Sequence, residues 1–470
     1  MSSMNGFCIT LILVVGLAGV FSAGLGLRGG KGSNPDEVLS LPGLAVQPKF
    51  KHYSGYLKAS GTKKLHYWFV ESQFEPETDP VVLWMNGGPG CSSLDGLLSE
   101  LGPFHLRDDG KTVYMNPYSW NNAANVIFLE APAGVGFSYS DDKNYTTDDD
   151  QVSMDNYLAL QDFFTKFPQF SKNPFFVTGE SYGGVYVPTL SMRILEGNAT
   201  INMQGFAVGN GLSSYALNDN SLMYFGYYHG LFGTDLWSQL QCYCCNASYC
   251  NFHDNAQPQC SLVVGEAMNI VYNIGLDIYN LYDDCAGGIP PHATVFKVAM
   301  SNLFRNYKIK YTPLIKKPPK LRVTPPCVNV TSSLIYLNNP DVRKALHIPT
   351  SVQDWDICSG VVGAQYVRKY QTLYNQYQTL VKHYRIMVYN GDIDMACNFL
   401  GDEWFVESLK LDKSGDRREW VSNKQIAGFV QDYTNVTLVT IKGAGHMVPQ
   451  DKPAQALKMF TAFIKNTPLN

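Results

Sequence analysis

One segment of the chain joins an apolar run to a tight, glycine-rich turn: Phe175-Phe176-Val177-Thr178-Gly179-Glu180-Ser181-Tyr182-Gly183-Gly184. The first four residues are typical of a strand, and the turn carries the pattern Gly-x-Ser-x-Gly. In a nucleophile elbow this pattern lifts the serine hydroxyl clear of a sheet, and the glycines allow close packing. The alternative is a glycine-rich turn with a purely structural role. The other segments of the sequence must therefore decide between a catalytic and a structural turn.

Other apolar runs and helical patterns alternate on both sides of this segment. Strands are predicted at Leu65–Val70, Val81–Met85, Asn125–Leu129, Tyr384–Tyr389 and Leu438–Ile441, and helices at Val152–Phe167 and Ala454–Ile464. Strands that are apolar on both faces and separated by helices indicate a sheet covered on both sides. The sequence therefore predicts an α/β fold with a central, mostly parallel sheet.

The composition of the 470 residues excludes several classes of protein. Hydrophobic residues make up 45% of the chain, charged residues 16%, and the formal net charge is -4. Intrinsic disorder requires fewer large apolar residues and a higher net charge. The near-neutral balance also argues against nucleic acid as the main partner.

The N-terminus is typical of a secretory signal. Leu11–Phe21 is apolar but short for a membrane span, and the small residues Ser22, Ala23 and Gly24 follow it. Because no Lys or Arg precedes this run, an uncleaved anchor stays as the alternative. We expect residues 1–23 to be a signal peptide and the rest of the chain to contain no membrane span.

Entry into the secretory pathway makes the cysteines candidates for disulfides. Cys8 would leave with the signal, while the cluster Cys242–Cys260 could instead bind zinc. That cluster has no paired histidines, and its spacings fit neither a zinc finger nor a ribbon, so disulfides are favoured and no metal is expected. Five sequons predict glycosylated surface loops: Asn144, Asn198, Asn246, Asn329 and Asn435.

The chain divides into three predicted regions after the signal. Residues 24–212 and 336–470 carry the α/β pattern, and 213–335 form an inserted subdomain rich in cysteine and tyrosine. A basic, proline-rich stretch near 305–323 is expected to be an exposed loop that proteases can reach. A nucleic-acid patch is the alternative for this stretch, but its prolines and the lumenal setting disfavour it.

A nucleophilic serine needs a base, and the base needs an orienting carboxylate. Asn390-Gly391-Asp392-Ile393-Asp394 follows what the sequence indicates is the next-to-last strand, and Gly443-Ala444-Gly445-His446-Met447-Val448-Pro449 follows the last. The carboxyl ends of parallel strands meet at one edge of a sheet, where ligands bind. The order Ser, Asp, His is that of an α/β-hydrolase.

A second glycine-rich turn, Asn86-Gly87-Gly88-Pro89-Gly90-Cys91-Ser92-Ser93, follows the strand that ends at Met85. Its backbone N–H groups could stabilise the oxyanion of a tetrahedral intermediate. A phosphate cradle is the alternative, but the Gly-Lys-Ser/Thr signature of such a loop is absent. We therefore expect no cofactor.

Together these segments resemble the four signature segments of the serine carboxypeptidases, over Gly55 to Ile464. The resemblance implies an α/β-hydrolase fold with a disulfide-stapled cap. It also implies Ser181 as nucleophile, His446 as general base and Asp394, the second aspartate of its string, as orienting carboxylate. The implied oxyanion donors are the N–H groups of Gly88 and Tyr182. The groups implied to hold the substrate's carboxylate are Asn86, Gly87, Glu100 and Glu180.

Two glutamates close to a substrate carboxylate should make substrate binding depend on pH. A glutamate can hydrogen-bond a carboxylate only if one of the two carries a proton, and like charges raise each other's pKa. We therefore predict that peptide binding weakens as pH rises, which gives an acidic optimum. Esters and amides without a free carboxylate should escape this effect.

The family pattern further implies the disulfides Cys91–Cys358, Cys244–Cys260, Cys245–Cys250 and Cys285–Cys327. Cys397 matches a family cysteine that is unpaired near the site, whereas Cys242 lies outside the pattern. The segment near 305–323 lies where lysosomal members of the family lose a linker peptide, which implies a two-chain mature enzyme made from a zymogen.

The resemblance implies three functions. The first is a lysosomal serine carboxypeptidase that releases hydrophobic C-terminal residues, with Met447 and Asp95 as weak candidates for the pocket of the departing residue. The second is an esterase or acyltransferase on the same scaffold. The third is a protective complex with lysosomal β-galactosidase and neuraminidase, which could coexist with catalysis. A homodimer is a further family expectation.

Overall fold

The structure is a computed structural model that describes residues 34–247, 249–289 and 325–470. The chain divides into two units, Met1–Pro35 and Asp36–Asn470. Only Asn34 and Pro35 of the first unit are described, and all the described helices and strands belong to the second. The predicted signal peptide (1–23) and the basic, proline-rich segment (305–323) lie outside the described residues.

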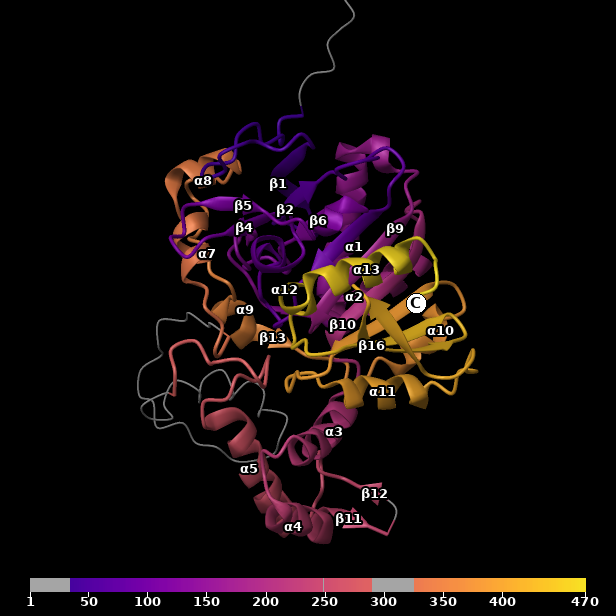
Figure 1. The fold of residues 1–470 in the computed structure, drawn as a ribbon. Helices are drawn as coiled ribbons and strands as arrows, with labels where there is room; N and C mark the ends of the chain where they lie inside the picture. Colours follow the sequence, from indigo (N-terminus) through magenta and orange to yellow (C-terminus); the bar gives the residue numbers. More distant parts are fainter. Residues whose placement is uncertain (1–33, 248, 290–324) are drawn as a thin grey trace, which may run out of the picture. The chain divides into compact units, whose positions relative to one another are not determined.

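An 11-stranded sheet runs through the second unit (Figure 1). Along the order β1-β2-β6-β3-β9-β10-β14-β17-β16-β15, all neighbours from β6 to β17 pair in parallel, and the outer pairs are antiparallel. The predicted α/β fold with a mostly parallel sheet is confirmed. The strands are β1 (His52–Lys58), β2 (Lys63–Val70), β3 (Val81–Met85), β6 (Asn125–Leu129), β7 (Tyr139–Ser140, beside β2), β9 (Phe175–Ser181), β10 (Met203–Gly211), β14 (Arg385–Gly391), β15 (Arg418–Ser422), β16 (Gln425–Tyr433) and β17 (Val436–Ile441).

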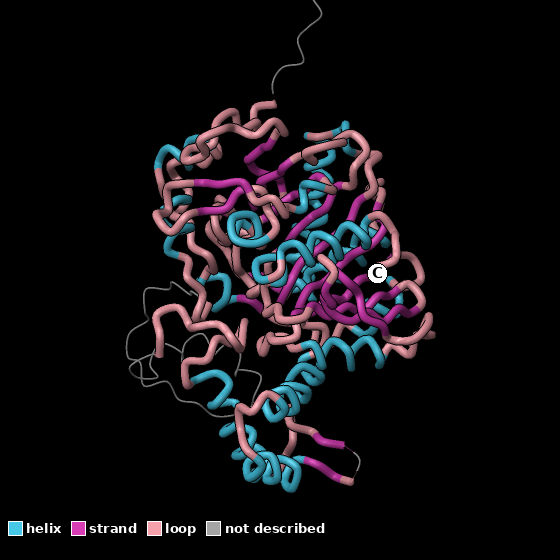
Figure 2. The backbone as a smooth tube through the Cα atoms, viewed as in Figure 1, coloured by secondary structure: helices cyan, strands magenta, loops and turns pink. Residues whose placement is uncertain are grey.

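Both faces of the sheet are buried because side chains alternate along each strand. In β3, Val82 and Trp84 belong to one hydrophobic cluster, while Val81 and Leu83 belong to the other. Helices cover both clusters and lie on either side of the strands in Figure 2. They are α1 (Asp149–Lys166), α2 (Gly183–Glu196), α10 (Tyr374–Leu380), α11 (Phe399–Ser408), α12 (Val448–Asp451) and α13 (Pro453–Ile464).

All the predicted strands and helices are present, but the order of strands along the chain needs a correction. The strand that ends before Asp392 is not the next-to-last, because the hairpin β15–β16 lies between β14 and β17. These strands alternate buried and exposed residues at the edge of the sheet, so they lack the continuous apolar run that marked the central strands. Strand β10 was also missed.

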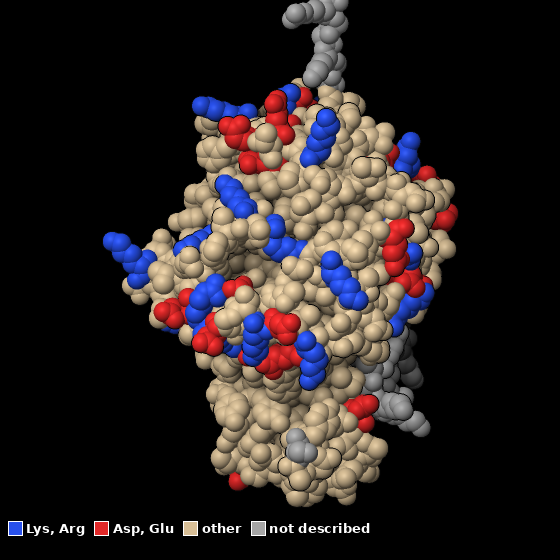
Figure 3. Space-filling model, turned by 90° about the vertical axis from the view of Figure 1, so that its right-hand side faces the viewer, with Lys and Arg blue, Asp and Glu red and all other residues tan. Residues whose placement is uncertain are grey.

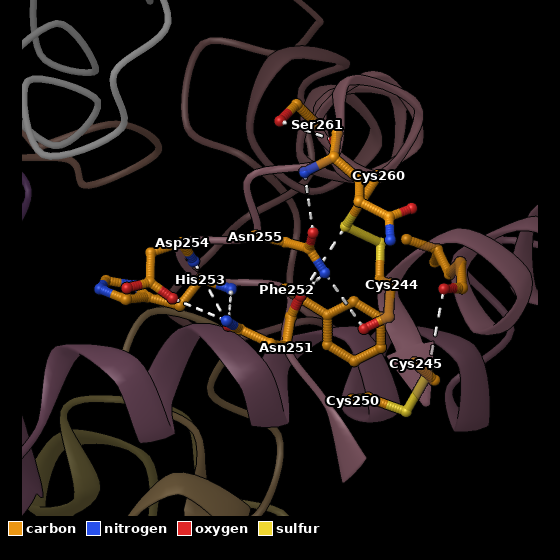
Figure 4. Close-up of a disulfide and its surroundings, with 12 residues drawn as sticks. Cys244, Cys245, Cys250, Asn251, Phe252, His253, Asp254, Asn255, Cys260 and Ser261 are labelled. Atoms are coloured by element: carbon orange, nitrogen blue, oxygen red, sulfur yellow. Dashed lines mark hydrogen bonds between the residues drawn. A yellow bond between two sulfur atoms is a disulfide. The ribbon is translucent and has the colours of Figure 1, made fainter. Parts of the chain in front are cut away.

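The insert after β10 has a hydrophobic core of its own, which includes Phe225, Trp237 and Val264. Two disulfides join its helices and hairpin, and Asn255 donates to the carbonyls of Cys244 and Asn251 beside them (Figure 4). No Lys or Arg occurs in residues 194–296, and the lower part of Figure 3 accordingly shows few charges. Its elements are α3 (Tyr215–Tyr228), α4 (Thr234–Cys244), β11 (Cys245–Asn246), β12 (Tyr249–Cys250) and α5 (Pro258–Asn273).

Short elements connect these parts. The limits proposed for the insert stay predictions, and the second of them, after residue 335, falls inside α7. The remaining elements are β4 (Phe104–Leu106), β5 (Val113–Met115), β8 (Thr147–Asp148), α7 (Thr331–Leu337), α8 (Pro340–Ala345), α9 (Gly360–Gln365), β13 (Tyr366–Val367), a π-helix (Gly96–Glu100) and two 3-10 turns (Trp120–Asn122 and Pro168–Phe170).

Candidate active site

Ser181 ends β9 and has a φ of 60°, a left-handed conformation that is uncommon outside glycine. The turn is tight because its glycines touch neighbouring strands. A Cβ on Gly179 would lie 2.5 Å from the Met85 carbonyl, and one on Gly184 would lie 2.5 Å from the Leu212 nitrogen. Helix α2 begins at Gly183, directly after the turn. This strand, strained turn and helix have the geometry of a nucleophile elbow.

His446 and Asp394 form a hydrogen-bonded pair on the two loops that follow β17 and β14. The Nδ1–Oδ2 distance is 2.8 Å, and both side chains are buried. Burial opposes the charged imidazole, but the Asp394 carboxylate outweighs it and raises the pKa of His446. With Nδ1 directed at the carboxylate, Nε2 is the nitrogen available to a nucleophile.

Asp394 is held by further donors that the sequence did not single out. Asn210 Nδ2 donates to Oδ2 at 2.9 Å, the Ala396 N–H donates to Oδ1 at 2.8 Å, and the Cys397 N–H donates to Oδ2 at 3.1 Å. Asn210 lies at a register shift near the end of β10, between Gly209 and Gly211, with a φ of 39°. These bonds fix the orientation of the carboxylate.

A segment of the insert around Tyr279 holds the loop that carries His446. The His446 N–H donates to the Tyr279 carbonyl at 2.7 Å, and the Tyr279 ring lies 5.0 Å from the imidazole. A Cβ on Gly445 would lie only 2.2 Å from that carbonyl, so this close approach requires glycine. No local signal in the sequence marks Tyr279, because its role arises from contacts distant in the chain.

Ser181 and His446 line one cleft, which also includes Gly87, Gly88 and Glu180. The glycine-rich turn reaches the elbow closely: a Cβ on Gly87 would lie 2.3 Å from the Tyr182 nitrogen. Tyr182 is the N-cap of α2, so its N–H lies at the positive end of the helix dipole. This arrangement can stabilise a negative charge that develops beside Ser181.

Asn86 joins two glutamates: Glu180, which lines this cleft with it, and Glu100, which is fully buried and is not part of the lining. Its Nδ2 donates to Glu100 Oε1 at 3.0 Å and to Glu180 Oε1 at 2.8 Å, while Trp84 Nε1 and the Gly96 N–H donate to its Oδ1 at 2.8 and 3.1 Å. The amide orientation is therefore fixed by its partners. Glu100 ends the one-turn π-helix, a feature common at functional sites.

The two carboxyl groups are buried and accept from the same Asn86 Nδ2, so a negative charge on one disfavours a negative charge on the other. Burial, and then the charge of Asp95, raises the pKa of Glu100. Burial, and then the charge of Glu100, raises the pKa of Glu180 well above its usual value. Glu100 Oε2 is buried and has no hydrogen-bond partner among the described residues, which disfavours the charged form of this carboxyl group.

Asp95 and Met447, the weak candidates for the pocket of the departing residue, both line the cleft. Desolvation raises the pKa of Asp95 to about 6. A carboxyl group with that pKa titrates between acidic and neutral pH.

Four disulfides are present, between the cysteines that the family resemblance pairs: Cys91–Cys358, Cys244–Cys260, Cys245–Cys250 and Cys285–Cys327. Cys397 is unpaired and buried next to Asp394, and its pKa is raised by burial and by that carboxylate. Cys242 is unpaired and exposed on α4, and nothing in the structure explains it. The asparagines of all five sequons are exposed.

A profile described as serine carboxypeptidase matches residues 42–466. The chain is a serine carboxypeptidase. The carboxypeptidase is 53% identical to the lysosomal protective protein of Mus musculus, a match that covers 92% of this chain and 94% of the mouse protein. It is 43% identical to the serine carboxypeptidase ctsa-4.1 of Caenorhabditis elegans, with 92% and 93% coverage.

The fold of this carboxypeptidase is also found in a crystal structure of Kex1(delta)p, a prohormone-processing carboxypeptidase from Saccharomyces cerevisiae. The TM-score is 0.70 at 22% identity, over 92% of this chain and 95% of the yeast chain. The predicted α/β-hydrolase fold is thereby confirmed. Among the described helices of the carboxypeptidase, none is both long and apolar enough to span a bilayer.

Proposed function

We propose that this carboxypeptidase, of the cathepsin A type, releases C-terminal residues from peptides at acidic pH through Ser181, His446 and Asp394. The observation that carries the proposal is the buried, hydrogen-bonded Asn86–Glu100–Glu180 cluster, of which Asn86 and Glu180 line the same cleft as the serine. Such a cluster matches the charge and hydrogen-bonding needs of a peptide's terminal carboxylate.

The chemistry is set by the geometry of the cleft. Ser181 Oγ attacks the last peptide carbonyl while its proton passes to His446 Nε2. The N–H groups of Gly88 and Tyr182 stabilise the oxyanion. His446 then protonates the leaving amine, the C-terminal amino acid departs, and water hydrolyses the acyl-enzyme with the same imidazole as base. Asp394 stabilises the imidazolium throughout.

The carboxylate clamp, which is made of Asn86, Gly87, Glu100 and Glu180, determines where the peptide is cut. The Gly87 N–H donates to the substrate's carboxylate, which replaces one glutamate as the acceptor of an Asn86 amide hydrogen, and protonated Glu100 or Glu180 adds an O–H donor. Only a residue with a free carboxylate fits this arrangement, so cleavage stops at the C-terminal bond. As pH rises, the glutamates ionise and repel the carboxylate, which weakens peptide binding.

The mouse relative's name, lysosomal protective protein, supports two finer parts of the proposal, the location and the protective complex. We place the carboxypeptidase in the lysosome, after removal of residues 1–23 and excision near 305–323. Hydrophobic residues are the preferred leaving groups, since Met447 lies in the cleft. Lysosomal β-galactosidase and neuraminidase are the proposed partners, and a homodimer the proposed assembly; co-purification of the three proteins from lysosomes tests the complex.

The alternative is an esterase or acyltransferase, which needs the same triad but no carboxylate clamp. The buried Asn86–Glu100–Glu180 cluster favours the peptidase because an ester substrate would leave these groups without a role.

The deciding experiment measures release of the C-terminal residue from an N-blocked hydrophobic dipeptide between pH 4 and 8, after linker cleavage. Wild type is compared with Ser181→Ala. Acid-favoured release that the variant abolishes is the expected result. Ester hydrolysis without peptide release would instead support the alternative, and inactivity on both would support a purely protective role.

A further inference from the structure

A second cavity lies beneath α13 and the C-terminal tail, and none of its lining residues belongs to the Ser181 cleft. It holds about 260 Å³, and its walls come from β14, β17, α13 and residues 466–469. That volume is slightly below the usual range for small-molecule sites, so it suits a small ligand rather than a peptide.

Arg385, the first residue of β14, lines this cavity. Its guanidinium stacks on Phe176 and Phe463, 5.6 and 5.5 Å from the ring centres. The buried Nε has no hydrogen-bond partner, and Nη2 has one long bond, 3.4 Å, to the Ile464 carbonyl. Among the described residues, no carboxylate lies within ion-pairing distance of Arg385.

The other charged groups of the cavity do not neutralise Arg385. Arg418 Nη1 pairs with Asp432 Oδ2 at 2.7 Å, and the second oxygen of that carboxylate accepts from Thr437 Oγ1 at 2.9 Å. The cavity therefore contains two guanidinium groups, those of Arg385 and Arg418, and one carboxylate, that of Asp432, whose two oxygens already have partners. A partly buried positive charge without an anion is costly, and guanidinium binds carboxylates well.

One wall of the cavity is apolar and includes Met387, Val439, Met459 and Phe463, while Thr437, Asn466 and Thr467 add polar groups to the lining. We propose that this cavity binds a short-chain aliphatic monocarboxylate, with the carboxylate on Arg385 and the chain against the apolar wall. A dianion is disfavoured, because only Arg385 lacks an anionic partner and the second negative charge would stay unpaired. A zwitterion is less suited, because among the described lining residues the only carboxylate is Asp432 and both of its oxygens already have partners, so no unpaired negative charge is left for an ammonium group.

The test uses hexanoate as the probe and hexanamide as its neutral counterpart, on the full chain at pH 7. Hexanoate at about 100-fold above its Kd should raise the melting temperature of wild type by about 3 °C. Arg385→Met should abolish this shift. Arg417→Gln, which removes an exposed arginine paired with Glu403, should retain it.

Binding of hexanoate in the catalytic cleft is the main competing explanation, and it predicts equal shifts in wild type and Arg385→Met. That result overturns the proposal, as does no shift in wild type or an equal shift with hexanamide. Should Arg385→Met fail to fold, Ala462→Leu decides the question by filling the cavity: it should lose the hexanoate shift and keep wild-type peptidase activity.

Discussion

Asn210 Nδ2 donates to Asp394 Oδ2 at 2.9 Å, and this is the same oxygen that contacts His446 Nδ1. The Asn210 side chain also accepts the Gly391 N–H at 2.9 Å, so it connects the end of β10 to the loop after β14. One amide therefore fixes both the carboxylate and the backbone that carries it. Within the proposed mechanism, Asn210 is a positioning residue for the triad.

Removing the Asn210 side chain should reduce kcat by about 10- to 100-fold, which is the effect of losing one hydrogen bond to a charged group. Asn210→Gly is the appropriate variant because glycine tolerates the φ of 39°. The value of kcat should fall for peptide and ester alike, while KM changes little. Asn210→Ala should show the same loss of kcat with lower thermal stability, and an unchanged kcat in both would refute the role.

The central strands and the catalytic loops could be predicted from sequence because their signals are local. Strands such as β3 and β9 are apolar on both faces, and the glycines around Ser181 mark a tight turn. Asn210 and Tyr279 could not be found in this way, since their importance depends on partners far away in the chain. The β15–β16 hairpin was missed because only one of its faces is buried.

Gly87→Ala should reduce kcat by about 100- to 1,000-fold, the usual effect of losing one oxyanion donor. The new Cβ would lie 2.3 Å from the Tyr182 nitrogen, so the backbone of the elbow must shift. The loss of kcat should be similar for peptide and ester, because both reactions pass through an oxyanion. KM should rise for the peptide alone, because the Gly87 N–H is a proposed donor to the terminal carboxylate. Gly265→Ala in α5 is the matched control: a Cβ there meets nothing within 4 Å, and activity should be unchanged.

Phe460→Ala should lower the free energy of unfolding by about 3–5 kcal/mol without affecting kcat. Phe460 is fully buried in α13 and stacks on Trp120 with ring centres 3.9 Å apart. The substitution leaves a cavity in the hydrophobic cluster on one face of the sheet. Denaturant unfolding measures the effect, and Phe74→Ala, at a side chain that is 70% exposed, should be nearly neutral.

The double variant Glu100→Gln/Glu180→Gln should extend peptide hydrolysis toward neutral pH. In wild type, burial raises the pKa of both carboxyl groups, so they stay protonated at acidic pH and ionise as pH rises. Glutamine keeps hydrogen-bond donors at every pH and carries no charge. The decline of peptide kcat/KM with rising pH should therefore become shallower.

The melting temperature should also depend less on pH in the double variant than in wild type. A carboxyl group whose pKa is higher in the folded than in the unfolded protein stabilises the fold below the unfolded value and loses that contribution as pH rises through the folded value. The wild-type melting temperature should thus fall more between pH 5 and 8 than that of the double variant. An ester without a free carboxylate is the control substrate, and its pH profile should follow His446. Because the charge of Glu100 contributes to the raised pKa of His446, the rise of ester activity should move to lower pH in the double variant, while its activity at higher pH should not change. Parallel changes at higher pH for peptide and ester would show that the glutamates act on the triad rather than on the substrate's carboxylate.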